Sequence, residues 1–277
     1  MTGLLAVCAS LVWLGLRGSP DGRLHIFFLD VGQGDAIFIS TPDGRQILVD
    51  GGPSPDALLD ELGDVMPFWD RSLDLVVLTH PDADHMNGLL VVPERYRIGR
   101  VVDSALSAGS DDAAAWAAVL STSEIPHITV FRGAQLRAGN VLLTVLGPPA
   151  NLSAAAAGDN AASLVLRLDY GRTSALLTGD APEAVETEML AATLPLDVDV
   201  LKVGHHGSAD STSGAFVAAV SPQLAVIQVG SGNSFGHPAP AVLDRLRDVE
   251  VLRTDLNGRV EAISDGTAWQ VRSRRHP

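Results

Sequence analysis

Side chains that bind metal ions are concentrated in one short stretch of the sequence, LTHPDADHMNGLL (78–90). Two histidines and two aspartates, His80, Asp82, Asp84 and His85, lie within six residues, directly after the apolar run LVVL. An aspartate at a helix start commonly caps free backbone amides, so capping is the alternative explanation for Asp82 and Asp84. Capping needs one aspartate and no histidine, whereas two nitrogen and two oxygen donors suit a divalent metal ion. The stretch therefore predicts a divalent-metal site.

Two later segments place the same kinds of side chain at the ends of predicted strands. Asp180 ends SALLTGD, and His205 and His206 end VDVLKVGHH. Taken alone, Asp180 is better explained as a helix cap, and the two histidines fit a metal site or a structural site equally well. Loops after strands are where a rigid scaffold places functional groups, so the three segments together predict one site. The histidines without acidic or glycine-rich neighbours are expected to be structural or solvated: His25, His127 and His276.

Composition limits what such a site can serve. The chain has 277 residues, 46% of them hydrophobic, which is enough for one large α/β domain or two small ones. A formal net charge of -14 argues against a generally basic surface for nucleic acid, and 5% aromatic residues argue against base stacking. An anionic substrate therefore needs a local positive charge, which a bound metal ion supplies. Cys8 is the only cysteine, which excludes an intrachain disulfide and a thiolate zinc site.

The elements that must position these residues alternate between short strands and helices. Strands are expected at 24–30, 35–40, 45–50, 73–80, 97–102, 127–132, 140–147, 163–171, 173–180, 198–206 and 223–230. Helices are expected at about 54–69, 85–92, 111–121, 182–193, 212–220 and 239–247. The turn TPDG (41–44) joins two of the strands as a hairpin. Consecutive hairpins exclude a purely parallel sheet, so we expect one mixed α/β domain without an internal linker.

The first sixteen residues, MTGLLAVCASLVWLGL, are almost wholly apolar. A membrane-spanning helix needs about 20 apolar residues, and a signal peptide normally begins with basic residues, which are missing here. Three interpretations stay open: the end of a transmembrane helix of a longer chain, a poor signal or anchor, and a packed N-terminal helix. Because GSPDG (18–22) is typical of a turn, we divide the chain into an apolar segment with its turn at 1–23 and a domain at 24–277.

The motifs together resemble the metallo-β-lactamase superfamily, and within it the C-terminal hydrolase domain of ComEC-type competence DNA-uptake channels. The resemblance runs from about Leu24 to the end of the chain, through FLDVGQGDAIFI (28–39), ILVDGG (47–52), LTHPDADHMNG (78–88), NAASLVLRL (160–168), LLTGD (176–180), LKVGHHGS (201–208) and NSFGHP (233–238). The narrower match rests on DVGQGD and KVGHHGS. The resemblance implies an α/β fold, a four-layer αββα sandwich of two mixed sheets with outer helices, and a metal site at one edge between the sheets.

The family's metal motif implies two divalent ions, Zn²⁺ or Mn²⁺. Their ligands would be His80, Asp82, Asp84, His85, Asp180 and His205. His80 and Asp82 would hold the first ion, and Asp84 and His85 the second. Asp180 would bridge both ions, and His205 would complete the second site. Asn160 lies where the family usually has a further histidine, so the first ion lacks a strong ligand. Because this set is enriched in oxygen donors, with three aspartates beside three histidines, manganese or a mixed site is as open as zinc. The choice between His205 and His206 as the ligand also stays open.

The resemblance also implies roles around the ions. Two ions about 3.5–4 Å apart lower the pKa of a shared water and clamp both oxygens of an in-line phosphoryl displacement. Asp84 would accept a hydrogen bond from the attacking water, and His237 or His206 would protonate the leaving oxygen. The residues expected to contact substrate or to orient these groups are Lys202, Ser208 and Asn233. For Asp35, contact with the site and a structural role in its turn are both open.

Three functions follow as hypotheses. The first is a metal-dependent phosphodiesterase, a nuclease that acts on single-stranded DNA beside a membrane channel, on the extracytoplasmic side, during competence-type uptake. The second is a hydrolase of a small ester, lactone or phosphocholine-type substrate, which the acidic charge and scarce aromatics favour. The third is a metal-stabilised module that binds DNA or a channel partner without turnover, because Asn160 weakens the first site. A strip of cations at the metal edge, with Arg132, Arg137 and Lys202 as candidates, would decide for DNA.

Overall fold

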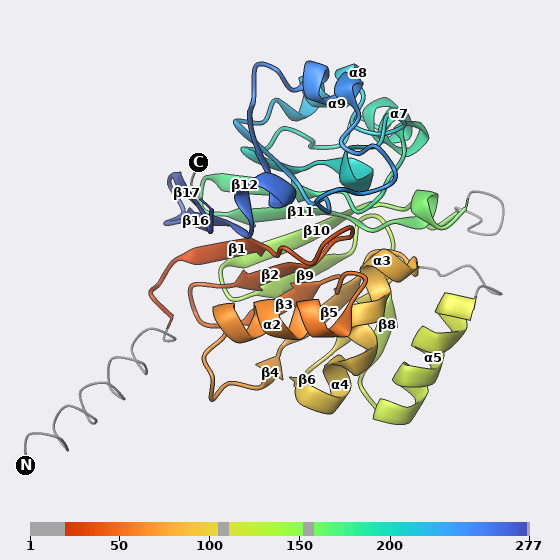
Figure 1. Ribbon diagram of the computed structural model, residues 1–277, viewed down its shortest axis with the longest axis vertical. Coiled ribbons are helices and arrows are strands. Elements are labelled where there is room, and N and C mark those ends of the chain that lie inside the picture. Colours follow the sequence, from red (N-terminus) through yellow and green to blue (C-terminus); the bar gives the residue numbers. More distant parts are fainter. Residues whose placement is uncertain (1–19, 105–110, 152–157, 276–277) are drawn as a thin grey trace, which may run out of the picture.

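The computed structural model describes residues 20–104, 111–151 and 158–275 of the chain (Figure 1). The apolar segment 1–16 and His276 lie outside the described residues. Two mixed sheets pack face to face, and helices cover both outer faces. This arrangement confirms the four-layer αββα sandwich. Within the three described ranges, no helix is both long enough and apolar enough to cross a membrane.

The first sheet has eight strands in the order β17-β16-β1-β2-β3-β5-β7-β8. Their bounds are β1 (Leu24–Phe28), β2 (Ile37–Ser40), β3 (Gln46–Val49), β5 (Leu75–Leu78), β7 (Val101–Asp103), β8 (His127–Thr129), β16 (Val260–Ser264) and β17 (Trp269–Ser273). Pairing is antiparallel from β17 to β3 and parallel from β3 to β8. A separate parallel pair, β4 (Ser72–Leu73) and β6 (Arg97–Ile98), precedes β5 and β7 along the chain.

The second sheet has seven strands in the order β15-β14-β13-β12-β11-β10-β9. Their bounds are β9 (Gln135–Ala138), β10 (Val141–Gly147), β11 (Val165–Tyr170), β12 (Thr173–Leu177), β13 (Val200–Lys202), β14 (Leu224–Ile227) and β15 (Glu250–Arg253). Strands β12 to β15 are parallel, and β9 to β12 are joined by antiparallel pairing. Each sheet therefore combines a hairpin half with a parallel half.

Helices form the two outer layers. Those of the first sheet's layer are α2 (Pro55–Val65), α3 (Ala83–Met86), η1 (Asn87–Val91), α4 (Val92–Arg95) and α5 (Asp111–Ser123). The second sheet is covered by α7 (Glu183–Ala191), α8 (Gly214–Val220) and α9 (Pro240–Arg245). The remaining short helices are η2 (Asn160–Ala162), η3 (Gly204–Gly207) and α10 (Thr254–Asn257). Leu58 and Trp116 anchor the first layer to its sheet, and Met189 and Phe216 anchor the second.

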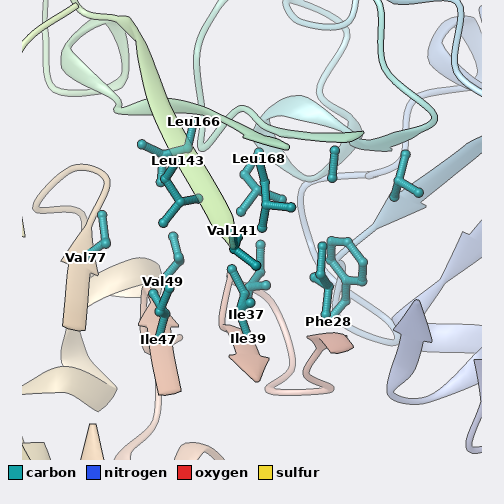
Figure 2. Packing of buried hydrophobic residues seen from close by; sticks show 14 of the residues in the cluster. Phe28, Ile37, Ile39, Ile47, Val49, Val77, Val141, Leu143, Leu166 and Leu168 are labelled. Carbon is teal, nitrogen blue, oxygen red and sulfur yellow. The ribbon is translucent and has the colours of Figure 1, made fainter. Parts of the chain in front are cut away.

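Apolar residues alternate along the strands between an inner and an outer core. In β2, Ile37 and Ile39 face the second sheet, whereas Phe38 packs beneath the helices of the first layer. Figure 2 shows side chains from the two sheets, among them Ile39, Leu143 and Leu168, pointing toward one another across the inner core. Each such side chain contributes about 1.5–3 kcal/mol when it is fully buried. The period of two, and not any single residue, gives the sheets their two apolar faces.

Most strands and helices expected from the sequence overlap an element of the structure, and the main differences concern a few segments. The expected strand at 97–102 is two strands, β6 and β7, because the chain changes sheets at Gly99, where a Cβ atom would lie 2.7 Å from Asp74 O. The helix expected at 54–69 ends at Val65, shortly before Pro67. The sequence pattern missed β9, β15, β16 and β17. Of these, β9, β15 and β17 are partly exposed edge strands, whose side chains lack a continuous apolar run.

Candidate metal centre

Four acidic and histidine side chains converge at one edge of the sandwich. Asp35 lies between β1 and β2, His85 in α3, Asp180 after β12 and His206 in η3. One ligand atom of each lies within 4.8 Å of all the others, and all four residues are buried. The carboxyl ends of parallel strands in both sheets supply most of these loops, so the two halves of the sandwich contribute jointly. The structure thus has a candidate metal site of four residues.

Several polar atoms in this cluster are buried without a hydrogen-bond partner: Asp35 Oδ1, His80 Nε2, His85 Nε2, Asp180 Oδ1 and His206 Nε2. His85 Nε2 lies 3.2 Å from Asp180 Oδ1, and His206 Nε2 lies 3.3 Å from Asp180 Oδ2, without the angles of a hydrogen bond. A buried polar atom without a partner costs about 1–3 kcal/mol. Imidazole nitrogens and carboxylate oxygens that face a common point are the donor set that zinc, manganese and iron accept, so these residues fit a divalent ion.

The far sides of the two histidine rings are held by hydrogen bonds. His85 Nδ1 lies 2.8 Å from Asp50 Oδ2, and Asp50 also accepts from the backbone amide and the hydroxyl of Thr79, each at 2.7 Å. His206 Nδ1 donates to the carbonyl oxygen of Gln228 at 3.1 Å. A carbonyl oxygen can only accept, so this bond fixes the ring tautomer that leaves Nε2 free as a ligand.

Close backbone packing fixes the loops that carry the ligands. The amide of Asp35 donates to Asp84 O at 3.2 Å, and the amide of Gly51 donates to His85 O at 2.6 Å. A Cβ atom on Gly34 would lie 2.1 Å from Asp84 O, and one on Gly88 would lie 1.9 Å from Gly51 O. The glycines of DVGQGD and MNG are therefore needed so that helix α3 can approach both turns.

Lys202, the chain's only lysine, lies beneath this cluster at the end of β13. Its side chain is buried, and Nζ donates to Gly179 O at 2.9 Å, forms an ion pair with Asp35 and lies 3.7 Å from Asp180 Oδ1. Burial alone would lower the pKa of Lys202, but Asp35 and Asp180 outweigh it and raise the pKa. Lys202 thus holds a permanent positive charge behind the carboxylates, and its role as a substrate contact stays a prediction.

The charges of the cluster depend on one another. Burial acts to raise the pKa of Asp180, but His206 and His85 outweigh it and hold the pKa well below its usual range. Burial acts to lower the pKa of His206, but Asp180 and Asp35 raise it well above the ordinary value. The carboxylates therefore keep protons on the imidazoles as long as no other cation is present. A bound divalent ion would replace those protons.

The other residues predicted from LTHPDADH surround the four-residue group. His80 is buried, its ring centroid 4.1 Å from that of His85, and its Nε2 lies 3.5 Å from Asp82 Oδ2. Asp84 Oδ2 lies 3.2 Å from His206 Nε2. Burial acts to raise the pKa of Asp84, but His206 and His85 lower it to about 2. The structure thus brings His80, Asp82 and Asp84 to the same edge, and their metal roles stay predictions.

The two adjacent histidines of KVGHHGS are placed differently. Both have left-handed backbone angles, with φ of 48° for His205 and 52° for His206, and only His206 belongs to the four-residue group. His205 is partly exposed, with Nε2 3.7 Å from Asp180 Oδ2, Nδ1 3.3 Å from Asp210 Oδ1, and Asn160 Nδ2 3.5 Å away from Nε2. The geometry favours His206 as the inner ligand and leaves His205 with Asn160 at the rim.

The loop before α9 brings His237 to this rim. Its ring centroid lies 5.9 Å from that of His205, and burial together with His205 and His206 lowers the pKa of His237. Asn233 accepts from the amide of His237 at 3.0 Å and donates to its carbonyl oxygen at 2.7 Å, so Asn233 holds this loop. Ser208 is half-buried and ends η3. The catalytic role of His237 and the substrate roles of Asn233 and Ser208 stay predictions.

The expected strip of cations at the metal edge is not formed by the described residues. Arg132 donates through both terminal nitrogens to Glu188. Arg137 lies in β9 and lines a cavity with Arg45 and Asp74, where β3 and β5 begin, which is the opposite end of these strands. Asp50 was missed from the sequence, although its position at the end of ILVDGG, directly after a strand, is the signal shared by the other site residues.

Residues 29–230 match the model of the metallo-β-lactamase superfamily. The chain belongs to the metallo-β-lactamase superfamily. Within this superfamily it is 32% identical over 265 residues to "ComE operon protein 3" of Bacillus subtilis, covering 88% of this chain and 33% of that protein. It is 29% identical over 288 residues to "Competence protein ComA" of Neisseria gonorrhoeae, covering 93% of this chain and 38% of that protein.

These relatives confirm the resemblance to ComEC-type competence proteins, and the chain spans about a third of their length. Among solved structures, the metallo-β-lactamase fold protein YhfI of Bacillus subtilis superposes with a TM-score of 0.58. It shares 14% sequence identity, and the match covers 83% of this chain and 96% of that one. At this identity the likeness concerns the fold alone. A superfamily fold hosts many reactions, so the reaction has to be argued from the site.

Proposed function

We propose that the chain is a metal-dependent phosphodiesterase that cleaves DNA, with single strands as its substrate, during competence-type uptake. The observation that carries this proposal is the buried cluster of Asp35, His85, Asp180 and His206, whose ligand atoms converge without hydrogen-bond partners. The competence proteins among the relatives support DNA as the substrate. The hydrolase domain would span 24–277, and the segment 1–23 would join it to a membrane channel with the domain on the extracytoplasmic side.

His85, Asp180 and His206 would hold the inner ion, and His80, Asp82 and Asp84 would complete a pair of Zn²⁺ or Mn²⁺ sites. Bound ions would supply a water of lowered pKa and a positive charge for the phosphodiester. Asp84 would accept a hydrogen bond from the attacking water, since its low pKa keeps it ionised. His237 would act on the leaving oxygen, because Asn233 holds its loop at the rim. His206 is better assigned to the ion than to proton transfer.

The test pairs metal analysis with DNA cleavage in the same preparation. Elemental analysis should find bound Zn or Mn, and a labelled single-stranded oligonucleotide should be cut only when metal is present. Asp180→Asn should abolish both metal binding and DNA cleavage. Asp248→Asn, at a side chain that is 91% exposed, should leave metal binding and cleavage unchanged. Metal-dependent cleavage that survives in Asp180→Asn would refute the assignment of the centre.

A small substrate is the second candidate, because the described residues form no cationic strip at the metal edge and the formal net charge is -14. Bound metal, no DNA cleavage and turnover of a chromogenic phosphodiester or ester would favour this hydrolase. Bound metal without any turnover would favour a non-catalytic module that binds DNA or a channel partner.

A further inference from the structure

An exposed patch of aromatic and arginine residues lies on the two segments 67–71 and 93–97, which precede β4 and β6; we call it the aromatic–arginine patch. Phe68 is 64% exposed and Trp69 is 49% exposed, among the largest exposed apolar side chains of the described residues. Their rings meet edge to face, with centroids 4.8 Å apart. Such a pair on a free surface presents apolar area that water solvates poorly.

The arginines of the patch are not neutralised by the protein. Arg71, Arg95 and Arg97 are exposed, and none of them pairs with a carboxylate among the described residues. Arg71 instead lies over the ring of Tyr96, 5.6 Å from its centroid. The patch therefore holds three arginines without an ion pair among the described residues, on a chain whose formal net charge is -14.

Two carboxylates, Asp70 and Glu94, lie near the three arginines and offset part of their charge, which leaves the patch with a net charge of +1. Asp70 accepts from Gln46 Nε2 at 2.5 Å and from the amide and hydroxyl of Ser72 at 3.0 and 2.6 Å. Glu94 is exposed on α4 and leaves the patch with a net positive charge. The patch therefore combines apolar rings with an excess of cations.

The patch adjoins the point where the described chain begins. Pro20 lines a cavity of about 280 Å³ together with Val65, Pro67 and Asp70. Asp70 also lines the neighbouring hollow that contains Trp69 and the arginines. The described chain therefore begins beside the aromatic–arginine patch, and the apolar sequence 1–16 precedes this point along the chain.

The patch lies at the end of the first sheet where β3 and β5 begin, because Asp70 contacts Gln46, the first residue of β3. The metal centre lies at the other end of these strands, where they are followed by Asp50 and His80. Figure 1 shows β4, β6 and α4 at the bottom of the view, away from α3. A surface bound to the patch would leave the metal centre pointing away from it.

We infer that the aromatic–arginine patch docks on the headgroup region of a bilayer that contains anionic phospholipid. Aromatic rings at headgroup depth and basic residues near anionic lipid are the usual interfacial anchors of membrane proteins. Single-stranded nucleic acid would also attract arginines, but the adjoining apolar sequence and the distance from the metal centre favour lipid. The inference does not depend on the proposed hydrolysis, and either can fail alone.

The experiment uses the full chain with vesicles of phosphatidylcholine, with and without phosphatidylglycerol. Both samples contain the same full chain, residues 1–16 included, so the difference in partition between the two kinds of vesicle isolates the anionic component. Arg95→Gln/Arg97→Gln should lower partition into the phosphatidylglycerol vesicles about 25-fold, at about fivefold per arginine. The matched variant Arg272→Gln/Arg275→Gln removes two exposed arginines from the β17 side, and should change partition less than about twofold. Phe68→Ser/Trp69→Ser should also weaken binding, with Phe235→Ser as its exposed aromatic control.

Hydrogen exchange gives the position of the contact. Amides of 67–72 and 93–97 should become protected on phosphatidylglycerol vesicles, whereas those of 233–237 should not. Equal partition of the patch variant and its matched control would overturn the inference. Protection of these segments by a single-stranded oligonucleotide, but not by vesicles, would overturn it in favour of a nucleic-acid surface.

Discussion

Two groups of histidines and carboxylates in this protein have similar composition and different geometry. At the edge of β1, His25 Nδ1 lies 2.7 Å from Glu261 Oε1, and His25 Nε2 lies 3.0 Å from Asp21 Oδ1. Each ring nitrogen has one carboxylate, so a protonated imidazole satisfies every partner. In the metal centre, Nε2 of His85 and of His206 faces carboxylate oxygens without forming a hydrogen bond.

Hydrogen-bond geometry distinguishes an ion-pair cluster from a metal site. A proton serves one donor and one acceptor along a line, so it fits the group around His25. A metal ion accepts several lone pairs from different directions, and this is the arrangement of the four converging residues. Residue types alone do not separate the two cases, because both consist of histidine and acidic side chains.

The largest effect on metal affinity should come from substituting one of the two adjacent histidines, His206, and not the other. His206→Gln should lower metal affinity more than about 100-fold, since loss of an outer hydrogen bond alone costs 10–100-fold. His205→Gln, at the partly exposed neighbour, should lower it less than about tenfold. Titration of each metal-free variant with Zn²⁺ and Mn²⁺ measures both. The reverse order would show that the metal centre was assigned to the wrong histidine.

Lys202→Met is expected to destabilise the metal-free protein by about 3 kcal/mol, because it leaves Asp35 as a buried charge without its cation. The double variant Asp35→Asn/Lys202→Met removes both charges and should recover most of this loss. Urea unfolding in the presence of a chelator measures the free energy of unfolding for the set. If the double variant is as unstable as the single one, the ion pair is not the cause.

The fold was largely predictable from the sequence, whereas the centre was predictable only in part. LTHPDADH and LLTGD predicted their side chains at strand ends, because an apolar run followed by polar residues marks the point where a strand leaves the core. Which of His205 and His206 faces the metal centre depends on left-handed backbone angles at both residues. No local sequence pattern indicates such angles at non-glycine residues.

Long-range contacts set the surroundings of several other predicted residues, which the sequence could not indicate. Arg132 looked available for substrate, but its partner Glu188 lies 56 residues further along the chain. Lys202 looked like a phosphate contact, and its burial between Asp35 and Gly179 follows from the packing of the two sheets. Asp35 itself had two open roles, and the structure places it in the four-residue group. Pairings of this kind are set by tertiary structure and not by neighbours in sequence.

Asp50→Asn tests the support behind a ligand. Asp50 accepts a hydrogen bond from the ring of His85, so the change should lower metal affinity about 10–100-fold while leaving the ligand itself in place. Asp103→Asn is the matched control, because Asp103 is also buried and lies 2.7 Å from a histidine nitrogen, that of His127, away from the centre. It should lower stability without changing metal affinity. Equal affinities of Asp50→Asn and the wild type would remove Asp50 from the centre.

The smallest effect is expected at His25, where the comparison predicts a response to protons and not to metal. Burial acts to lower the pKa of His25, but Glu261 and Asp21 raise it above its ordinary value of 6.5. A folded-state pKa above the unfolded one stabilises the protein fully below pH 6.5, and this stabilisation is lost as the pH rises through the folded-state pKa. The free energy of unfolding should therefore fall from pH 6 to pH 9 by less than about 1 kcal/mol more in the wild type than in His25→Gln, since the pair is partly exposed. Unfolding at the two pH values, with and without Zn²⁺, measures this difference. A Zn²⁺-dependent difference between the two proteins would mean that hydrogen-bond geometry does not distinguish the two clusters, because a histidine with both nitrogens satisfied by carboxylates would then also bind the ion.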